Sequence, residues 1–161
     1  LPVLERNGIC DGPSFHKAVG YIRRFSEKAW RNGIKTCLEV NLSAEEVRNL
    51  LDAVDDPWVK IYFDSQNLYA LNGTSMARYF SALSDVIGGV HLKDGIGCML
   101  SGSLLGEGDS GFFKTAAAIR NSNYSGSLII ESVYDKASVC GLGTPEELLA
   151  RDAATLRKAF E

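Results

Sequence analysis

The chain has 161 residues, of which 45% are hydrophobic and 23% charged, a composition typical of a globular protein. Lys+Arg 17 against Asp+Glu 20 gives a formal net charge of -3, so the broad basic field that drives nucleic-acid binding is missing. No apolar run approaches the roughly 18 residues of a membrane-spanning helix, and no leader pattern opens the sequence. We therefore expect a cytoplasmic protein with neither nucleic acid nor a membrane as its partner.

The four cysteines, Cys10, Cys37, Cys98 and Cys140, lie far apart and form no CxxC pair. This spacing is a poor match to a zinc ribbon and to the disulfide framework of a small secreted domain. We expect free thiols in a reducing compartment.

Helical patterns and short apolar runs alternate along the chain. The expected helices are 14–32, 43–54, 74–87, 112–124 and one that begins at 144. The expected strands are 34–40, 59–64, 89–94 and 127–132. This alternation predicts βα units, that is, an α/β protein with a parallel sheet covered by helices, and we expect a single domain over 1–161.

Several residues predict where these helices begin and end. Ser14 and Thr74 are candidate N-caps, and residues 43–46 form a capping box. Gly88 and Gly89 are expected to end the helix over 74–87. Thr144, followed by Pro145, opens the last helix. The longest connection follows the strand over 89–94, and a loop of this size is typically where an α/β enzyme covers its substrate.

Four side chains able to bind a metal stand near the ends of the four predicted strands: Glu39, Asp64, His91 and Glu131. The carboxyl ends of parallel strands lie on one rim of a sheet, so these residues can converge. A single carboxylate at a strand end is more often a helix cap, and a lone histidine is more often a packed residue. Their recurrence in all four strands favours a metal or acid/base site. Three carboxylates and one imidazole suit Mn²⁺ or Mg²⁺, with Zn²⁺ or Co²⁺ as alternatives.

Sequence motifs extend the pattern. VHLKD at 90–94 is followed by LLGEGDSGFFKTAAAIRNSNYSGSLIIES at 104–132, and IKTCLEV and YFDSQN lie upstream. Together they resemble the C-terminal part of the sugar phosphate isomerase/epimerase superfamily, the xylose isomerase-like TIM barrels, over roughly residues 15–160. That superfamily includes ketose 3-epimerases, inosose dehydratases and isomerases, hydroxypyruvate isomerase and endonuclease IV.

The resemblance implies that Glu39, Asp64, His91 and Glu131 bind one divalent metal, and that the two glutamates are the catalytic acid/base pair. It implies a metal-dependent isomerase or epimerase acting on a sugar or sugar phosphate through an enediolate. The alternatives are a lyase of the inosose- or dehydroshikimate-dehydratase type, and a non-catalytic sugar-binding or regulatory homologue.

Three further residues are expected to contact the substrate. Asn67 can donate a hydrogen bond to a substrate oxygen, and it stands where ketose 3-epimerases commonly have a histidine. Lys93 lies at the rim, within reach of a hydroxyl or phosphate, and Glu107 belongs to the glycine-rich turn of the long loop. Endonuclease IV needs more histidines than His16 and His91 to hold three metals, which argues against that activity.

Length sets a further expectation. A complete (β/α)8 barrel has eight strands in about 250 residues, and the four predicted strands resemble strands five to eight. Residues 1–12 would then be the loop after the fourth strand. A half barrel exposes strand edges and an apolar rim. We therefore expect a fragment of a longer polypeptide, or a homo-oligomer or second chain or segment that completes the barrel.

Overall fold

The computed structural model describes residues 12–161, and its helices and strands alternate as expected. Their order along the chain is α2 (Gly12–Trp30), β1 (Thr36–Leu38), α3 (Ala44–Val54), β2 (Val59–Asp64), α4 (Asn67–Asn72), α5 (Met76–Leu83), β3 (Ile87–Leu92), α6 (Phe112–Arg120), β4 (Leu128–Ile130) and α7 (Pro145–Phe160). The described residues fall into two compact units: 12–63 with Val86–Gly89, and Asp64–Asp85 with Val90–Glu161.

The four strands that the structure describes follow one another in the sheet in chain order, β1-β2-β3-β4. β1 runs parallel to β2, with Leu38 opposite Ile61, and β3 runs parallel to β4, with Leu92 opposite Ile130. Strands that are neighbours in both sequence and sheet, each reached through a helix, are the arrangement expected of repeated βα units. The predicted α/β fold with a parallel sheet is confirmed.

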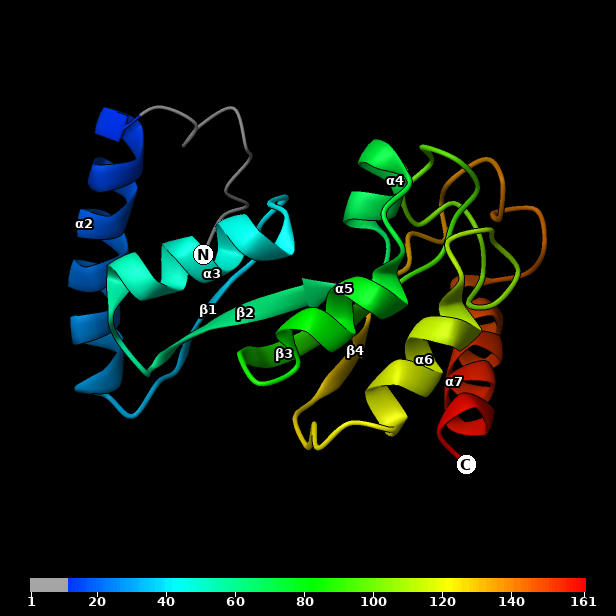
Figure 1. Ribbon diagram of the computed structural model, residues 1–161. Helices are drawn as coiled ribbons and strands as arrows, with labels where there is room; N and C mark the ends of the chain where they lie inside the picture. Colours follow the sequence, from blue (N-terminus) through cyan, green and yellow to red (C-terminus); the bar gives the residue numbers. More distant parts are fainter. Residues whose placement is uncertain (1–11) are drawn as a thin grey trace. The chain divides into compact units, whose positions relative to one another are not determined.

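In the first unit, α2 packs on α3 and on β1 (Figure 1). Side-chain hydrogen bonds join α2 to the end of α3 and to the residues that follow it. Ser26, fully buried on α2, donates a hydrogen bond of 2.7 Å to Asp56, and Arg23 donates one of 2.9 Å to the carbonyl oxygen of Val54. The predicted capping box at the start of α3 is present, because Ser43 and Glu46 bind each other's backbone N–H.

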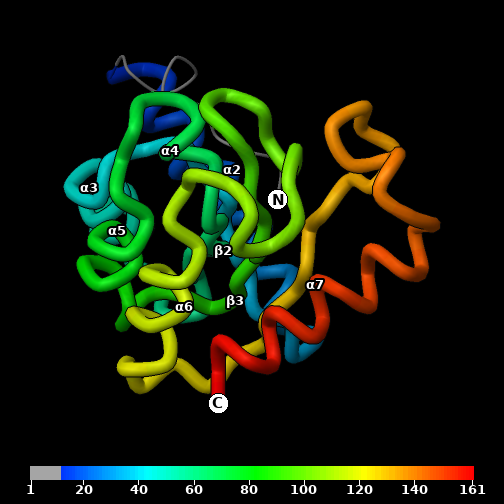
Figure 2. The backbone as a smooth tube through the Cα atoms, turned by 90° about the vertical axis from the view of Figure 1, so that its right-hand side faces the viewer, coloured from blue at the N-terminus to red at the C-terminus, as the bar shows by residue number. Residues whose placement is uncertain are grey.

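In the second unit, α6 packs against α5 and against α7 (Figure 1). Phe80 of α5 and Phe112 of α6 are almost fully buried, as expected of apolar residues on the covered face of an amphipathic helix. Thr144 and Glu147 form the capping box of α7, with Pro145 at its first turn. Figure 2 shows the long segment between β3 and α6, drawn in green to yellow, as irregular backbone with several turns.

The boundaries of some elements differ from the prediction. α5 ends at Leu83, and Gly88 and Gly89 lie inside β3 rather than at the end of a helix. A Cβ atom at Gly88 would lie 2.7 Å from Cys37 Sγ, and one at Gly89 would lie 2.6 Å from the ring of Tyr62. These glycines therefore allow side chains of β1 and β2 to approach the backbone closely, which is a common reason for glycine in a strand.

Two predicted caps are wrong as well. Ser14 lies within α2, which begins at Gly12. Thr74 binds the side chain of Asn72, and the residue before α5 is Ser75, whose side chain makes no cap hydrogen bond. The short helix α4 was not predicted.

Two other predictions can be compared with the structure. Cys37, Cys98 and Cys140 are free thiols, while Cys10 lies outside the described residues. So do residues 1–11 of the opening loop predicted over 1–12, and its last residue, Gly12, begins α2. Among the helices that the structure describes, none has the length and apolar character to cross a membrane.

Candidate metal centre

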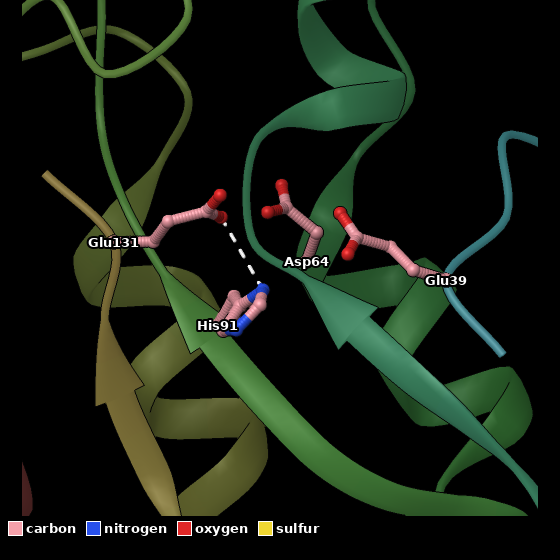
Figure 3. Close-up of side chains that lie close together, drawn as sticks. All are labelled: Glu39, Asp64, His91 and Glu131. Atoms are coloured by element: carbon pink, nitrogen blue, oxygen red, sulfur yellow. Dashed lines mark ion pairs between the residues drawn. The ribbon is translucent and has the colours of Figure 1, made fainter. Parts of the chain in front are cut away.

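Three of the four predicted ligands come together in the second unit. Asp64 is the last residue of β2, His91 belongs to β3, and Glu131 directly follows β4. One ligand atom of each lies within 4.8 Å of the ligand atoms of the other two, and His91 Nδ1 is 3.3 Å from Glu131 Oε2 (Figure 3). Figure 3 also draws Glu39, which belongs to the first unit, where it follows β1. The parallel sheet therefore brings the carboxylates and the imidazole of the second unit to one place.

Lys93 lies among these side chains. Its Nζ is 2.9 Å from Asp64 Oδ2 and 3.0 Å from Glu131 Oε2, and its side chain is only 6% exposed. Burial disfavours the ammonium, but the two carboxylates outweigh burial and raise the pKa of Lys93 above its usual value. A full positive charge therefore stands between two of the predicted ligands.

Asp64 is oriented by the backbone that follows it. Its Oδ1 accepts hydrogen bonds from the N–H groups of Gln66, at 2.8 Å, and Asn67, at 2.7 Å. Burial raises the pKa of Asp64, while Lys93 and these two N–H groups oppose the rise. Because Oδ1 is occupied by backbone donors, Oδ2 is the oxygen left to face a cation.

Glu131 is held through its backbone and is more accessible than Asp64. Its N–H donates to the carbonyl oxygen of Leu92 at 2.9 Å, and its own carbonyl oxygen accepts from Ser101 Oγ at 2.8 Å. Burial acts to raise the pKa of Glu131, but Lys93 and then His91 outweigh it, so that pKa is lowered. The charged carboxylate is therefore the favoured form.

Ser65 and Gln66 connect this cluster to its surroundings, a role that sequence reasoning missed. Ser65 Oγ accepts from the N–H of Lys93 at 2.8 Å and donates to the carbonyl oxygen of Lys93 at 2.7 Å. Gln66 donates to the carbonyl oxygen of Met99 at 2.9 Å and accepts from the N–H of Ser101 at 2.8 Å. The segment DSQN at 64–67 therefore fixes both Lys93 and part of the long loop.

Asp94 organises the rest of that loop. Its Oδ1 accepts from Gly95 N–H at 2.9 Å and Ser110 Oγ at 2.7 Å, and its Oδ2 accepts from the N–H groups of Gly106, at 3.0 Å, and Gly108, at 3.1 Å. A Cβ atom at Gly108 would collide with this carboxylate, which explains a glycine there. The sequence predicted the glycine-rich turn, but it did not predict that Asp94 binds the backbone of that turn.

Asp152 is a second buried carboxylate that sequence reasoning missed. It lies on α7, where Oδ1 accepts from Leu105 N–H at 2.7 Å, and Oδ2 accepts from the hydroxyls of Ser132 and Tyr134, both at 2.8 Å. The signal available in sequence was an aspartate four residues after buried Leu148, on the covered face of the helix. Asp152 ties the long loop to the segment after Glu131.

The other predicted substrate contacts are dispersed. Asn67 begins α4 next to Asp64, whereas Glu107 lies on the exposed loop surface and forms an ion pair of 2.9 Å with Arg151. A substrate-binding role for Asn67, Lys93 and Glu107 stays a prediction, as does metal binding by Glu39. His16 is exposed on α2 and its ring contacts Phe15 edge-on.

The donor atoms of the second-unit cluster suit a divalent cation. Asp64 and Glu131 offer carboxylate oxygens, and His91 offers an imidazole nitrogen, within one small volume. Oxygen donors with one nitrogen are the set that Mn²⁺ and Mg²⁺ accept, and Zn²⁺ and Co²⁺ tolerate. The chemistry and the spacing of these residues therefore fit a metal site.

Comparison with known proteins identifies the family. The profile of the family described as "Xylose isomerase-like TIM barrel" matches residues 11–159, nearly the whole chain. The chain belongs to this family. No curated protein sequence matches it.

Solved structures agree on the fold. The D-allulose 3-epimerase from Methylomonas sp. superposes with a TM-score of 0.76 at 20% identity, over 92% of this chain and 57% of that chain. An L-ribulose 3-epimerase gives 0.77 at 15% identity, over 93% and 55%. A xylose isomerase domain protein from Planctomyces limnophilus gives 0.75 at 16% identity, over 92% and 54%. The chain therefore spans little more than half the length of these proteins.

Proposed function

We propose that this chain carries the metal and acid/base residues of a divalent-metal-dependent isomerase or epimerase acting on a sugar or sugar phosphate. The observation that carries the proposal is the convergence of Asp64, His91 and Glu131 in a member of the xylose isomerase-like TIM barrel family. Two of the solved structures with the same fold are described as epimerases of D-allulose and L-ribulose, which supports a carbohydrate as the substrate class.

Glu39 is the proposed fourth ligand. It directly follows β1, as Asp64 ends β2 and Glu131 follows β4, so it is the carboxylate at the equivalent position of its own strand. Such a donor set favours Mn²⁺ or Mg²⁺, with Zn²⁺ or Co²⁺ as alternatives. When bound, the metal would supply a Lewis acid that stabilises negative charge on the substrate oxygens.

Glu131 is the proposed base. Its side chain is 43% exposed, against 4% for Asp64, so it is the more accessible of the two carboxylates. Its charged form, which accepts a proton, is favoured by Lys93 and His91. Glu39 is the proposed acid that returns the proton. Return to the opposite face of the substrate inverts a carbon centre, whereas transfer between neighbouring carbons interconverts ketose and aldose.

The proposed substrate contacts follow from charge and position. Lys93 already lies between Asp64 and Glu131, so a substrate oxygen that binds next to Glu131 would also come within reach of the ammonium. Asn67 begins α4 beside Asp64 and carries a side-chain amide that can donate a hydrogen bond. Glu107 would act from the surface of the long loop, where a substrate hydroxyl would compete with Arg151.

We also propose that a second segment or a second copy of the chain completes the barrel. The described residues supply four strands, whereas a barrel of this type has eight. β4 is at one end of the strand order, and its central residue Ile129 is 45% exposed. Exposed strand edges tend to pair with further strands. If a second copy completes the barrel, light scattering on the purified chain should give the mass of a dimer or larger assembly. If a separate segment completes it, the purified chain should be an inactive monomer, and an active monomer would contradict both.

The catalytic proposal is tested by proton exchange. The purified protein, loaded with Mn²⁺, is incubated with a panel of ketoses and ketose phosphates in D₂O and followed by NMR. We expect deuterium to enter the carbon next to the carbonyl group, and the Glu131→Gln variant to lose this exchange. Glu146→Gln, which changes an exposed glutamate in the first turn of α7, is the matched control and should exchange like the wild type.

Other outcomes separate the alternatives. Failure of the wild-type protein to bind any divalent metal would rule out the proposed mechanism. A product lighter by one water would identify a dehydratase instead of an isomerase. Metal binding without exchange on any carbohydrate would indicate a non-catalytic homologue.

A further inference from the structure

Lys93 is placed where a bound cation would be expected. Its Nζ lies 2.9 Å from Asp64 Oδ2 and 3.0 Å from Glu131 Oε2, and both oxygens belong to proposed metal ligands. Asp64 Oδ1 is engaged by two backbone N–H groups, so Oδ2 is the oxygen on which a metal and Lys93 would both depend. The ammonium therefore shares the oxygens that a metal requires.

The main chain of Lys93 is fixed. Ser65 is fully buried, and its hydroxyl binds both the N–H and the carbonyl oxygen of Lys93. The aliphatic part of the Lys93 side chain is buried as well, since the whole side chain is 6% exposed. The charge is therefore directed toward the two carboxylates by the fold and is not a solvated surface charge.

The charges around Lys93 explain what it does to the site. Asp64 and Glu131 are two negative charges brought close together in a partly buried place, which is unfavourable without a positive charge between them. The ammonium provides that charge when no metal is bound. A divalent cation that binds the same oxygens would be repelled by it at short range.

We propose that Lys93 is a built-in counter-cation that holds the metal-free site assembled and weakens its affinity for divalent metal. The part that concerns metal affinity rests on the proposed function, in which Asp64, His91 and Glu131 are metal ligands. The part that concerns the metal-free protein depends only on the ion pairs. Lys93 thus raises the stability of the metal-free protein and lowers its affinity for the metal.

The experiment compares the wild-type protein with Lys93→Met, which keeps most of the side-chain volume and removes the charge. Each protein is stripped of metal with a chelator, melted while followed by circular dichroism, and titrated with Mn²⁺ by calorimetry. We expect metal-free Lys93→Met to melt at least about 3 °C lower and to bind Mn²⁺ at least about tenfold more tightly. Lys114→Met, an exposed lysine on α6, is the matched control and should resemble the wild type.

Lys93→Arg is the second variant, because it keeps the charge. We expect wild-type affinity for Mn²⁺, and this measurement still tests the proposal if Lys93→Met does not fold; Mn²⁺ binding tightened tenfold in Lys93→Arg would overturn it. Unchanged or weaker Mn²⁺ binding in folded Lys93→Met would also overturn it. If neither the wild type nor Lys93→Met binds Mn²⁺, the proposed function fails. The melting temperatures then test Lys93 alone, and equal values would overturn its role in the metal-free protein.

Discussion

Two sets of carboxylates in the second unit, Asp94 with Asp152 and Asp64 with Glu131, differ in the groups that bind them. Asp94 and Asp152 have no exposed surface and accept hydrogen bonds from backbone N–H groups and hydroxyls, all of them neutral donors. Asp64, which is nearly as buried, gives one oxygen to backbone donors and turns the other toward the ammonium of Lys93. Burial alone therefore does not separate Asp64 from Asp94 and Asp152, whereas the charge of the bound partner does.

This difference has a chemical consequence. Asp94 accepts from three backbone N–H groups and Asp152 from one, and a main-chain donor cannot leave without unfolding its loop, so we assign both carboxylates a structural role. An ammonium on a flexible side chain can be replaced by another cation, so Asp64 and Glu131 keep the capacity to bind a ligand. The carboxylates that face a cation are the ones to which we assign function.

The largest expected effect is on the free energy of unfolding, from removing the carboxylate of Asp94. Asp94→Ala would leave three backbone N–H groups and the hydroxyl of Ser110 without their acceptor. We expect it to lower the free energy of unfolding by about 3 to 5 kcal/mol, measured by urea denaturation. Asp109→Ala, an exposed aspartate of the same loop that binds the N–H of Gly97, should cost less than about 1 kcal/mol. Equal losses would show that burial of Asp94 is unimportant.

The next largest effect is expected at Asp64, one of the two carboxylates to which we assign function. Asp64→Asn keeps an oxygen for the N–H groups of Gln66 and Asn67 but removes the charge that faces Lys93. We expect affinity for Mn²⁺, measured by calorimetry, to fall about a hundredfold, which corresponds to about 2.7 kcal/mol. Asp152→Asn should change Mn²⁺ affinity by no more than a few fold, because no ligand oxygen is altered. Equal losses in both variants would remove the distinction between the two sets.

A smaller effect is expected from truncating Asp152. Asp152→Ala would leave the Leu105 N–H and the hydroxyls of Ser132 and Tyr134 without an acceptor, and the two hydroxyls can turn to solvent. We expect a loss of about 2 kcal/mol in the free energy of unfolding, from urea denaturation. Asp135→Ala, an exposed aspartate on the same segment as Tyr134, should change this free energy little. A loss above that of Asp94→Ala would contradict the assignment of Asp94 as the main anchor.

Sequence patterns predicted most of the fold, because each βα unit carries local signals. The strand over 59–64 was predicted with the bounds that the structure has. The capping boxes at Ser43 and Thr144 were predicted correctly, because each depends only on residues three positions apart. The errors came from signals with two meanings. A pair of glycines such as Gly88 and Gly89 is typical of a helix end. Here the glycines make room for side chains of β1 and β2, namely Cys37, Lys60 and Tyr62, and no local pattern reveals those contacts.

The candidate site was predicted only in part, for the same reason. Asp64, His91 and Glu131 could be found because parallel topology turns three strand ends into one location. The partners that orient them could not, because Ser65 reaches Lys93 across the sheet and Ser101 reaches Glu131 from the long loop. Contacts between residues about thirty positions apart depend on the folded backbone and leave no spacing rule in the sequence.

The smallest expected effect is a pH dependence of stability that comes from the hydrogen bond between Tyr134 and Asp152. Partial burial and the hydrogen bond to Asp152 raise the pKa of Tyr134 from 10.0 to about 12. Because this folded pKa lies above the unfolded value, the neutral phenol contributes its full stability below about pH 10, and the contribution is lost as pH rises toward 12. We therefore expect the difference in unfolding free energy between the wild type and Tyr134→Phe to shrink over that window in urea titrations. Asp152→Asn should also lower the pH at which the phenolate absorbance of Tyr134 appears. A difference that stays constant with pH would show that Asp152 does not hold the phenol.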